Sequence, residues 1–157
     1  MGPEGSLIKL NQALAANPPT YLHLSTHGSF QRLNPLGSGL ELARNDRLTV
    51  GDLLSKFGML SGNRLAILSA CETGVTSTNA PAEAIGLPAA FMGAGASGVI
   101  STLWTVDDRS TTFLINKFYE LHRNNNMDPP KALAQAQNWL RTATYQDLIC
   151  MIHSGNI

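Results

Sequence analysis

Three short, almost continuously apolar segments constrain the fold of this chain most strongly. They span residues 21–26, 65–70 and 98–103. A strand that is covered on one face alternates apolar and polar side chains, whereas a strand covered on both faces reads as a nearly continuous apolar run. We therefore expect the three segments to be strands in the middle of a parallel sheet.

Helical patterns lie between and after these segments. They cover residues 7–16, 50–57, 82–94, 110–123 and 131–143. The recognisable helix starts are Thr49 with Asp52, Asp128 before Pro129, and Thr144 with Asp147. The first and last of these have the spacing of a capping box, and a proline fits a first helical turn. Alternating strands and helices predict an α/β fold with right-handed crossovers.

A small hairpin is expected to interrupt the alternation. Residues 40–42 and 47–49 flank Asn45-Asp46, a pair that tolerates tight-turn dihedrals. Three strands are few for a doubly wound sheet, and the chain starts almost at a helix and ends on one. We therefore expect residues 1–157 to form a single domain that is truncated at both ends, with further sheet strands beyond them.

Charge and cysteine content exclude several classes of protein. Lys plus Arg and Asp plus Glu number 11 each, so no overall field attracts nucleic acid or an anionic membrane. Two cysteines are too few for the disulfide framework of a small secreted protein, and no cleavable leader is recognisable. The uncharged stretch 84–106 is long enough to span a bilayer, but Pro88 and four glycines interrupt it. These features predict a cytoplasmic protein with no membrane or direct nucleic-acid partner.

Two residues with catalytic chemistry directly follow the first two predicted strands. They are His27 and Cys71. The carboxyl ends of adjacent strands meet at one edge of an open α/β sheet, where ligands bind. A thiol with an imidazole that manages its proton is the minimal equipment for acyl transfer. Gly28 permits close backbone approach, and the N–H groups of Gly28 and Cys71 are candidate donors to an oxyanion.

Three sequence blocks in this order resemble the CHAT domain family. They are YLHLSTHG at residues 21–28, LSACETG at residues 68–74 and STLWTVDD at residues 101–108. The resemblance runs over nearly the whole chain and includes the helical patterns at 82–94 and 131–137. It implies a caspase-like three-layer sandwich with a mainly parallel sheet, similar to separase and gingipain. It also implies a His-Cys dyad on successive strands and frequent attachment to tetratricopeptide repeats.

Two carboxylates follow the third strand and have two readings. Asp107 and Asp108 precede the helix near Ser110, where they would cap it and complement its dipole. Alternatively, Asp108, or Asp107 in its place, meets a basic side chain of a substrate beside Cys71. Separase prefers arginine there and has a similar Leu-Trp block, and this likeness adds Trp104 to the expected substrate-binding residues.

Less specific alternatives remain open for each candidate. Cys71 fits a core position, His27 fits a loop histidine, and Cys150 is expected to be a half-buried structural thiol. His23 and His27 have a zinc-like spacing, but only on a helix, so no metal and no cofactor are expected.

The expected function is that of a cysteine endopeptidase that cleaves a protein or peptide substrate after a basic residue. A catalytically silent CHAT scaffold or protein-interaction module is the alternative. A small-molecule hydrolase or nucleotide-binding α/β domain ranks last, because no Gly-rich loop follows any strand. The expected partners are the substrate and a tetratricopeptide-repeat regulatory region, and the oligomeric state is left open.

Overall fold

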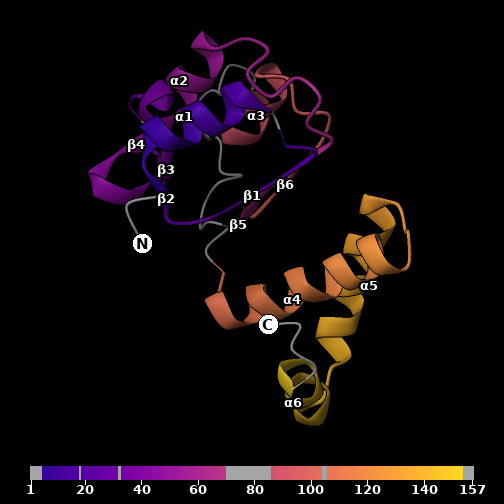
Figure 1. Ribbon diagram of the computed structural model, residues 1–157. Coiled ribbons are helices and arrows are strands. Elements are labelled where there is room, and N and C mark those ends of the chain that lie inside the picture. The colour runs from indigo at the N-terminus through magenta and orange to yellow at the C-terminus, as the bar shows by residue number, and fades with distance from the viewer. Residues whose placement is uncertain (1–4, 18, 32, 70–85, 104–105, 154–157) are drawn as a thin grey trace. The chain divides into compact units, whose positions relative to one another are not determined.

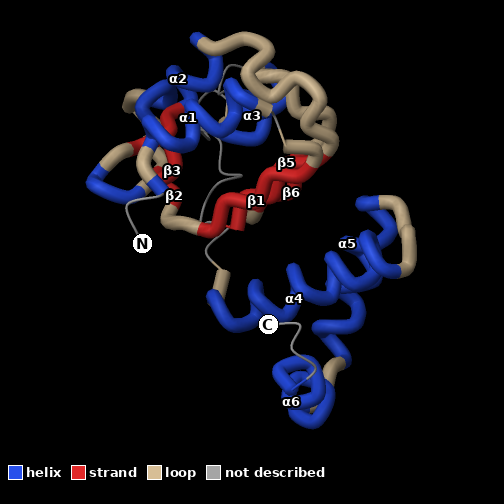
Figure 2. Tube along the Cα trace, in the orientation of Figure 1, coloured by secondary structure: helices blue, strands red, loops and turns tan. Residues whose placement is uncertain are grey.

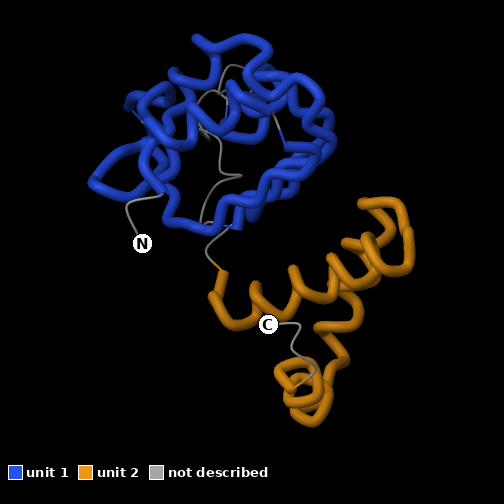
Figure 3. Tube along the Cα trace, in the orientation of Figure 1, with its two compact units in different colours: residues 1–105 blue, residues 106–157 orange. Residues whose placement is uncertain are grey.

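The chain divides into two compact units. A computed structural model describes residues 5–17, 19–31, 33–69, 86–103 and 106–153. The first unit comprises residues 1–105 and the second comprises residues 106–157 (Figure 3). Every described strand belongs to the first unit, and the described part of the second unit is helical.

The first unit contains a parallel sheet whose described strands are the three apolar segments. They are β1 (Tyr21–Ser25), β5 (Leu65–Ser69) and β6 (Val99–Ser101), in the order β1-β5-β6 (Figure 2). Leu22 of β1 lies opposite Ala66 of β5, which in turn lies opposite Val99 of β6. The prediction of parallel strands is therefore confirmed. The prediction that they are covered on both faces holds for β5, the central described strand, whereas β1 and β6 are only partly buried. The further strands expected beyond the two ends of the chain stay a prediction.

Three helices of the first unit lie on the same side of this sheet (Figure 1). They are α1 (Leu7–Ala16), α2 (Val50–Ser55) and α3 (Leu87–Gly93). One core holds Leu22, Ala66 and Leu68 of the strands together with Leu14, Leu53 and Phe91 of the helices. Burying each large apolar side chain contributes about 1.5–3 kcal/mol, so this core holds the strands in place. The α/β class with helices flanking a parallel sheet is confirmed, and it is consistent with a caspase-like sandwich.

A second, antiparallel sheet packs into the same core. It consists of β2 (Gly28–Ser29), β3 (Gly39–Glu41) and β4 (Arg47–Thr49), with the short 3₁₀ turns Pro35–Gly37 and Ala43–Asn45 between them. The hairpin of β3 and β4 is as predicted, whereas β2 is an addition. In the turn between β3 and β4, the residues with positive φ are Arg44 and Asn45. The turn therefore lies one residue earlier than the expected pair Asn45-Asp46.

Asp46, which was expected in the turn, instead connects the hairpin to α1. Its carboxylate accepts the N–H of Leu7 at 2.9 Å, and its backbone carbonyl accepts the N–H of Leu42 at 2.8 Å. Ser6 is the N-cap residue of the same helix. A carboxylate near a helix N-terminus also complements the helix dipole.

The uncharged stretch contains a helix, a turn and a strand rather than one long helix. Its described part forms α3 and β6, joined by a turn at Gly95. Gly95 has a φ of 113°, and a Cβ there would lie 2.9 Å from the backbone nitrogen of Ser61, so the turn requires glycine. Within the described ranges, no helix has the length and apolarity needed to cross a membrane.

The second unit consists of three helices in its described part. They are α4 (Asp108–Tyr119), which continues into a π-helical turn (Glu120–Asn124), α5 (Pro129–Thr142) and α6 (Tyr145–His153). Lys117 links the first two helices, because its ammonium lies 5.4 Å from the centre of the Trp139 ring. The same ammonium forms an ion pair of 2.7 Å with Glu120.

Two expectations for the second unit need correction. Asp128 occupies the N-cap of α5, but its side chain makes no capping hydrogen bond. Pro129 and Pro130 follow it, and Pro130, at the second helical position, has no N–H that a cap side chain could accept. Cys150 is exposed rather than half-buried, because α6 buries Met151, and the adjacent position on a helix points about 100° away.

Three helices have a carboxylate at their N-terminus that accepts hydrogen bonds from the same end of the helix. Partial burial tends to raise the pKa of Asp52, but hydrogen bonds from Thr49 and the charge of Lys56 outweigh it and lower that pKa. The backbone N–H and hydroxyl of Ser110 lower the pKa of Asp107. The hydroxyl and N–H of Thr144 lower the pKa of Asp147.

These lowered pKa values predict loss of stability in acid. A carboxylate with a lower pKa in the folded state stabilises the fold fully above its unfolded pKa, and this contribution disappears as the pH falls through the folded pKa. We expect the free energy of unfolding to decline below about pH 4. Urea unfolding at a series of pH values from acidic to neutral measures this free energy. In a variant with asparagine at positions 52, 107 and 147, the free energy of unfolding is expected to depend less on pH. If the free energy falls equally with pH in both proteins, these three carboxylates are not the cause of the acid loss.

Candidate active site

The strands that lead to the two expected catalytic residues are direct neighbours. Ser25, at the end of β1, lies opposite Ser69, at the end of β5, in parallel register. His27 is two positions beyond Ser25 in the sequence, and Cys71 is two positions beyond Ser69. Cys71 lies outside the described residues. The adjacency on which a dyad depends is confirmed, while the approach of the two side chains stays a prediction.

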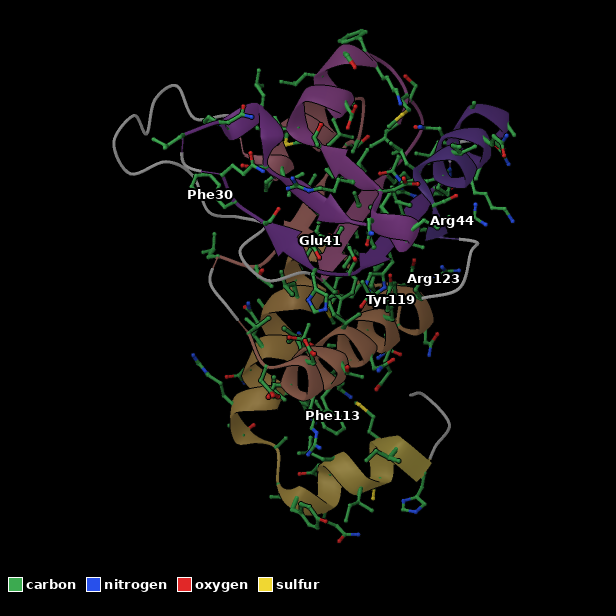
Figure 4. All side chains as sticks on the ribbon, turned by 90° about the vertical axis from the view of Figure 1, so that its left-hand side faces the viewer. Phe30, Glu41, Arg44, Phe113, Tyr119 and Arg123 are labelled. Atoms are coloured by element: carbon green, nitrogen blue, oxygen red, sulfur yellow. The ribbon has the colours of Figure 1, made fainter. Side chains whose placement is uncertain are left out.

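His27 and the residue before it, Thr26, are both hydrogen-bonded to β3. The N–H of Glu41 donates to the carbonyl of His27 at 2.7 Å. The hydroxyl of Thr26 donates to the carbonyl of the same glutamate, whose place on β3 is labelled in Figure 4. The side chain of His27 is exposed. The hairpin could be predicted from the sequence, but its hydrogen bonds to Thr26 and His27 could not, since no local pattern indicates which segment β3 will pair with.

Strand pairing determines the direction of the Gly28 N–H group. The bond from Glu41 to His27 makes these two residues a hydrogen-bonded pair of an antiparallel ladder. Such pairs alternate with pairs that are not hydrogen-bonded, and Gly28 lies opposite Leu40 in the next pair. The N–H of Gly28 therefore points away from β3 and is not used by that ladder. Its role as an oxyanion donor stays a prediction.

A side-chain hydrogen bond also connects β1 and β5 close to their carboxyl ends. Nε2 of His23 lies 2.8 Å from Oγ of Ser69. Desolvation lowers the pKa of the His23 imidazole. The part of the chain that the structure describes contains no group of three or more histidine, cysteine or acidic side chains suited to a metal ion.

A comparison with protein families decides what kind of chain this is. The family model for the CHAT domain matches residues 1–150. The chain belongs to the CHAT family. This family is caspase-like and is related to cysteine peptidases. The matched range includes all of the first unit and most of the second. A search among curated proteins found no significant match.

The two candidate specificity residues of this CHAT chain have different local roles. Asp107 is the N-cap of α4, and its Oδ1 accepts the backbone N–H of Ser110 at 2.9 Å and the hydroxyl of Ser110 at 3.0 Å. Asp108 is the first residue of the helix, and its side chain is exposed and takes no part in this cap. The capping role is thus confirmed for Asp107. Trp104 lies outside the described residues.

Proposed function

We propose that this CHAT chain is the catalytic portion of a cysteine endopeptidase, with His27 and Cys71 as its dyad. The observation that carries the proposal is the parallel pairing of β1 with β5 through Ser25 and Ser69. Equal offsets from the two strand ends support the proposal that His27 and Cys71 share one edge of the sheet. The relation of the family to cysteine peptidases supports the same reading.

The proposed reaction needs only groups of this chain, the peptide and water. His27 accepts the thiol proton of Cys71, and the sulfur attacks the carbonyl carbon of the scissile bond. The N–H groups of Gly28 and Cys71 hold the resulting oxyanion. His27 then protonates the leaving amine, which leaves a thioester on Cys71. Water hydrolyses the thioester, which releases the acid and restores the thiol.

The proposed substrate is a protein or peptide with a basic residue before the scissile bond. Asp108 carries an exposed carboxylate that its helix does not use, so it is available to a guanidinium. Trp104 is proposed to line the same pocket. A tetratricopeptide-repeat region is the proposed regulator, and the cytoplasm is the proposed location.

A peptide probe that ends in arginine and carries a thiol-reactive group tests the proposal. Cys71 is expected to react at least about tenfold faster than the exposed Cys150, because a paired imidazole promotes the thiolate. Mass spectrometry of the two cysteine-containing peptides measures both rates in one sample. His27→Ala is expected to abolish the difference. Equal rates in the unmodified chain would favour a catalytically silent CHAT scaffold instead.

A further inference from the structure

His27 lies at the junction between the two sheets of the first unit. The strand β1 ends at Ser25 and β2 begins at Gly28, so only Thr26 and His27 lie between them. Within the described residues, the paired register of β1 with β5 ends at Ser25 and Ser69. The orientation of the His27 backbone therefore depends on what holds these two junction residues.

Glu41 of β3 holds both junction residues through its own backbone. Its N–H donates to the carbonyl of His27 at 2.7 Å, and its carbonyl accepts the hydroxyl of Thr26. The side chain of Glu41 is exposed, and neither bond involves it. We call these two hydrogen bonds the Glu41 clamp.

The clamp is attached to a well-anchored part of the fold. Glu41 pairs with Arg47 of β4, and the neighbouring cross-strand pair, Leu40 and Leu48, is buried to 1% exposure or less. A guanidinium nitrogen of Arg47 donates to the hydroxyl of Ser29 on β2 and to the carbonyl of Gly37 at 3.1 Å. The hairpin is thus packed into the core and hydrogen-bonded to β2. Its backbone can therefore hold the two junction residues in a fixed position.

We propose that the Thr26 hydroxyl is a positioning group for His27, acting through the Glu41 clamp. This inference rests on the proposed dyad and adds a residue to it. The bond to Glu41 attaches the Thr26 side chain to β3 and thereby restricts movement of the Thr26 backbone, and the residue before His27 helps to set the direction from which the imidazole leaves the backbone. Without the hydroxyl, the clamp keeps only the bond at the His27 carbonyl, and we expect the imidazole to be less well aligned with the thiol of Cys71. Small misalignments of catalytic groups have large effects on rate.

The test compares alkylation of Cys71 and Cys150 by iodoacetamide over a range of pH in four forms of the chain. They are the unmodified chain, Thr26→Val, Thr26→Ala and Thr26→Ser. In the valine and alanine variants, we expect the alkylation rate of Cys71 near neutral pH to be roughly tenfold lower. The pH dependence of that rate is expected to shift toward the pH dependence of Cys150. The serine variant retains a hydroxyl and is expected to restore both. Thr142→Val is the matched control, because its hydroxyl also donates to backbone carbonyls, those of Asn138 and Trp139 at 3.2 Å each.

The possible outcomes separate this inference from the proposed function. If Cys71 of the unmodified chain reacts no faster than Cys150, the dyad and the positioning role fail together. If it reacts faster and the valine and alanine variants match it, only the positioning role is overturned. A serine variant that behaves like valine overturns it as well. Loss of the folded circular dichroism spectrum in both valine and alanine variants would assign Thr26 to folding and overturn the inference.

Discussion

Peptidase activity is expected to fall by about a thousandfold or more when either Cys71 or His27 is replaced by alanine. Cys71→Ala removes the atom that forms the thioester. His27→Ala removes the group that takes the thiol proton and later protonates the leaving amine. The decrease is expected in kcat, because neither side chain is needed to bind the peptide. Steady-state cleavage of an arginine-containing peptide by the active form of the protein measures it.

The double variant supplies the sharper form of this test. Residues that act as one catalytic unit are strongly non-additive, so replacing both is expected to cost little more than replacing one. Cys150→Ala and His153→Ala are matched controls, since both residues are exposed on α6. Both are expected to retain activity. Full activity in Cys71→Ala, or losses that multiply in the double variant, would contradict a dyad.

Arginine peptides are expected to be cleaved about a hundredfold more efficiently than norleucine peptides, as kcat/KM. A carboxylate that meets a guanidinium with two parallel hydrogen bonds favours arginine. An uncharged side chain in the same pocket leaves the carboxylate unpaired, which costs about 3–5 kcal/mol when the pocket is fully buried. We set the expected preference at about a hundredfold, below the full cost of a buried unpaired charge, because Asp108 is exposed. Asp108→Asn is expected to remove most of the preference.

Asp107→Asn is the control, because Asp107 caps α4 and asparagine caps a helix about as well as aspartate. This variant is expected to keep both stability at neutral pH and the arginine preference. If the unmodified protein cleaves both peptides equally, the pocket is wrongly assigned. The same conclusion follows if Asp107→Asn and Asp108→Asn each retain the preference for arginine.

Much of the fold could be predicted from local features of the sequence. The three apolar segments became β1, β5 and β6, and the most continuous burial is that of β5, which lies between the other two. Thr49 with Asp52 and Thr144 with Asp147 form the predicted reciprocal hydrogen bonds, because a capping box joins residues only three apart. The three blocks that resemble the CHAT family led to the correct family for the same reason: each is a contiguous run of residues.

The tertiary structure decided the features that join distant residues. Asp46 caps a helix that begins 39 positions earlier, and Glu41 clamps the junction at Thr26 and His27. Neither pairing leaves a periodic signal, because each depends on how the hairpin packs against the core. The direction of the Gly28 N–H depends on which residue of β3 lies opposite it, and a shift of one residue would reverse it. Sequence therefore determined the elements and the candidate dyad, whereas packing determined how the histidine at the end of β1 is held.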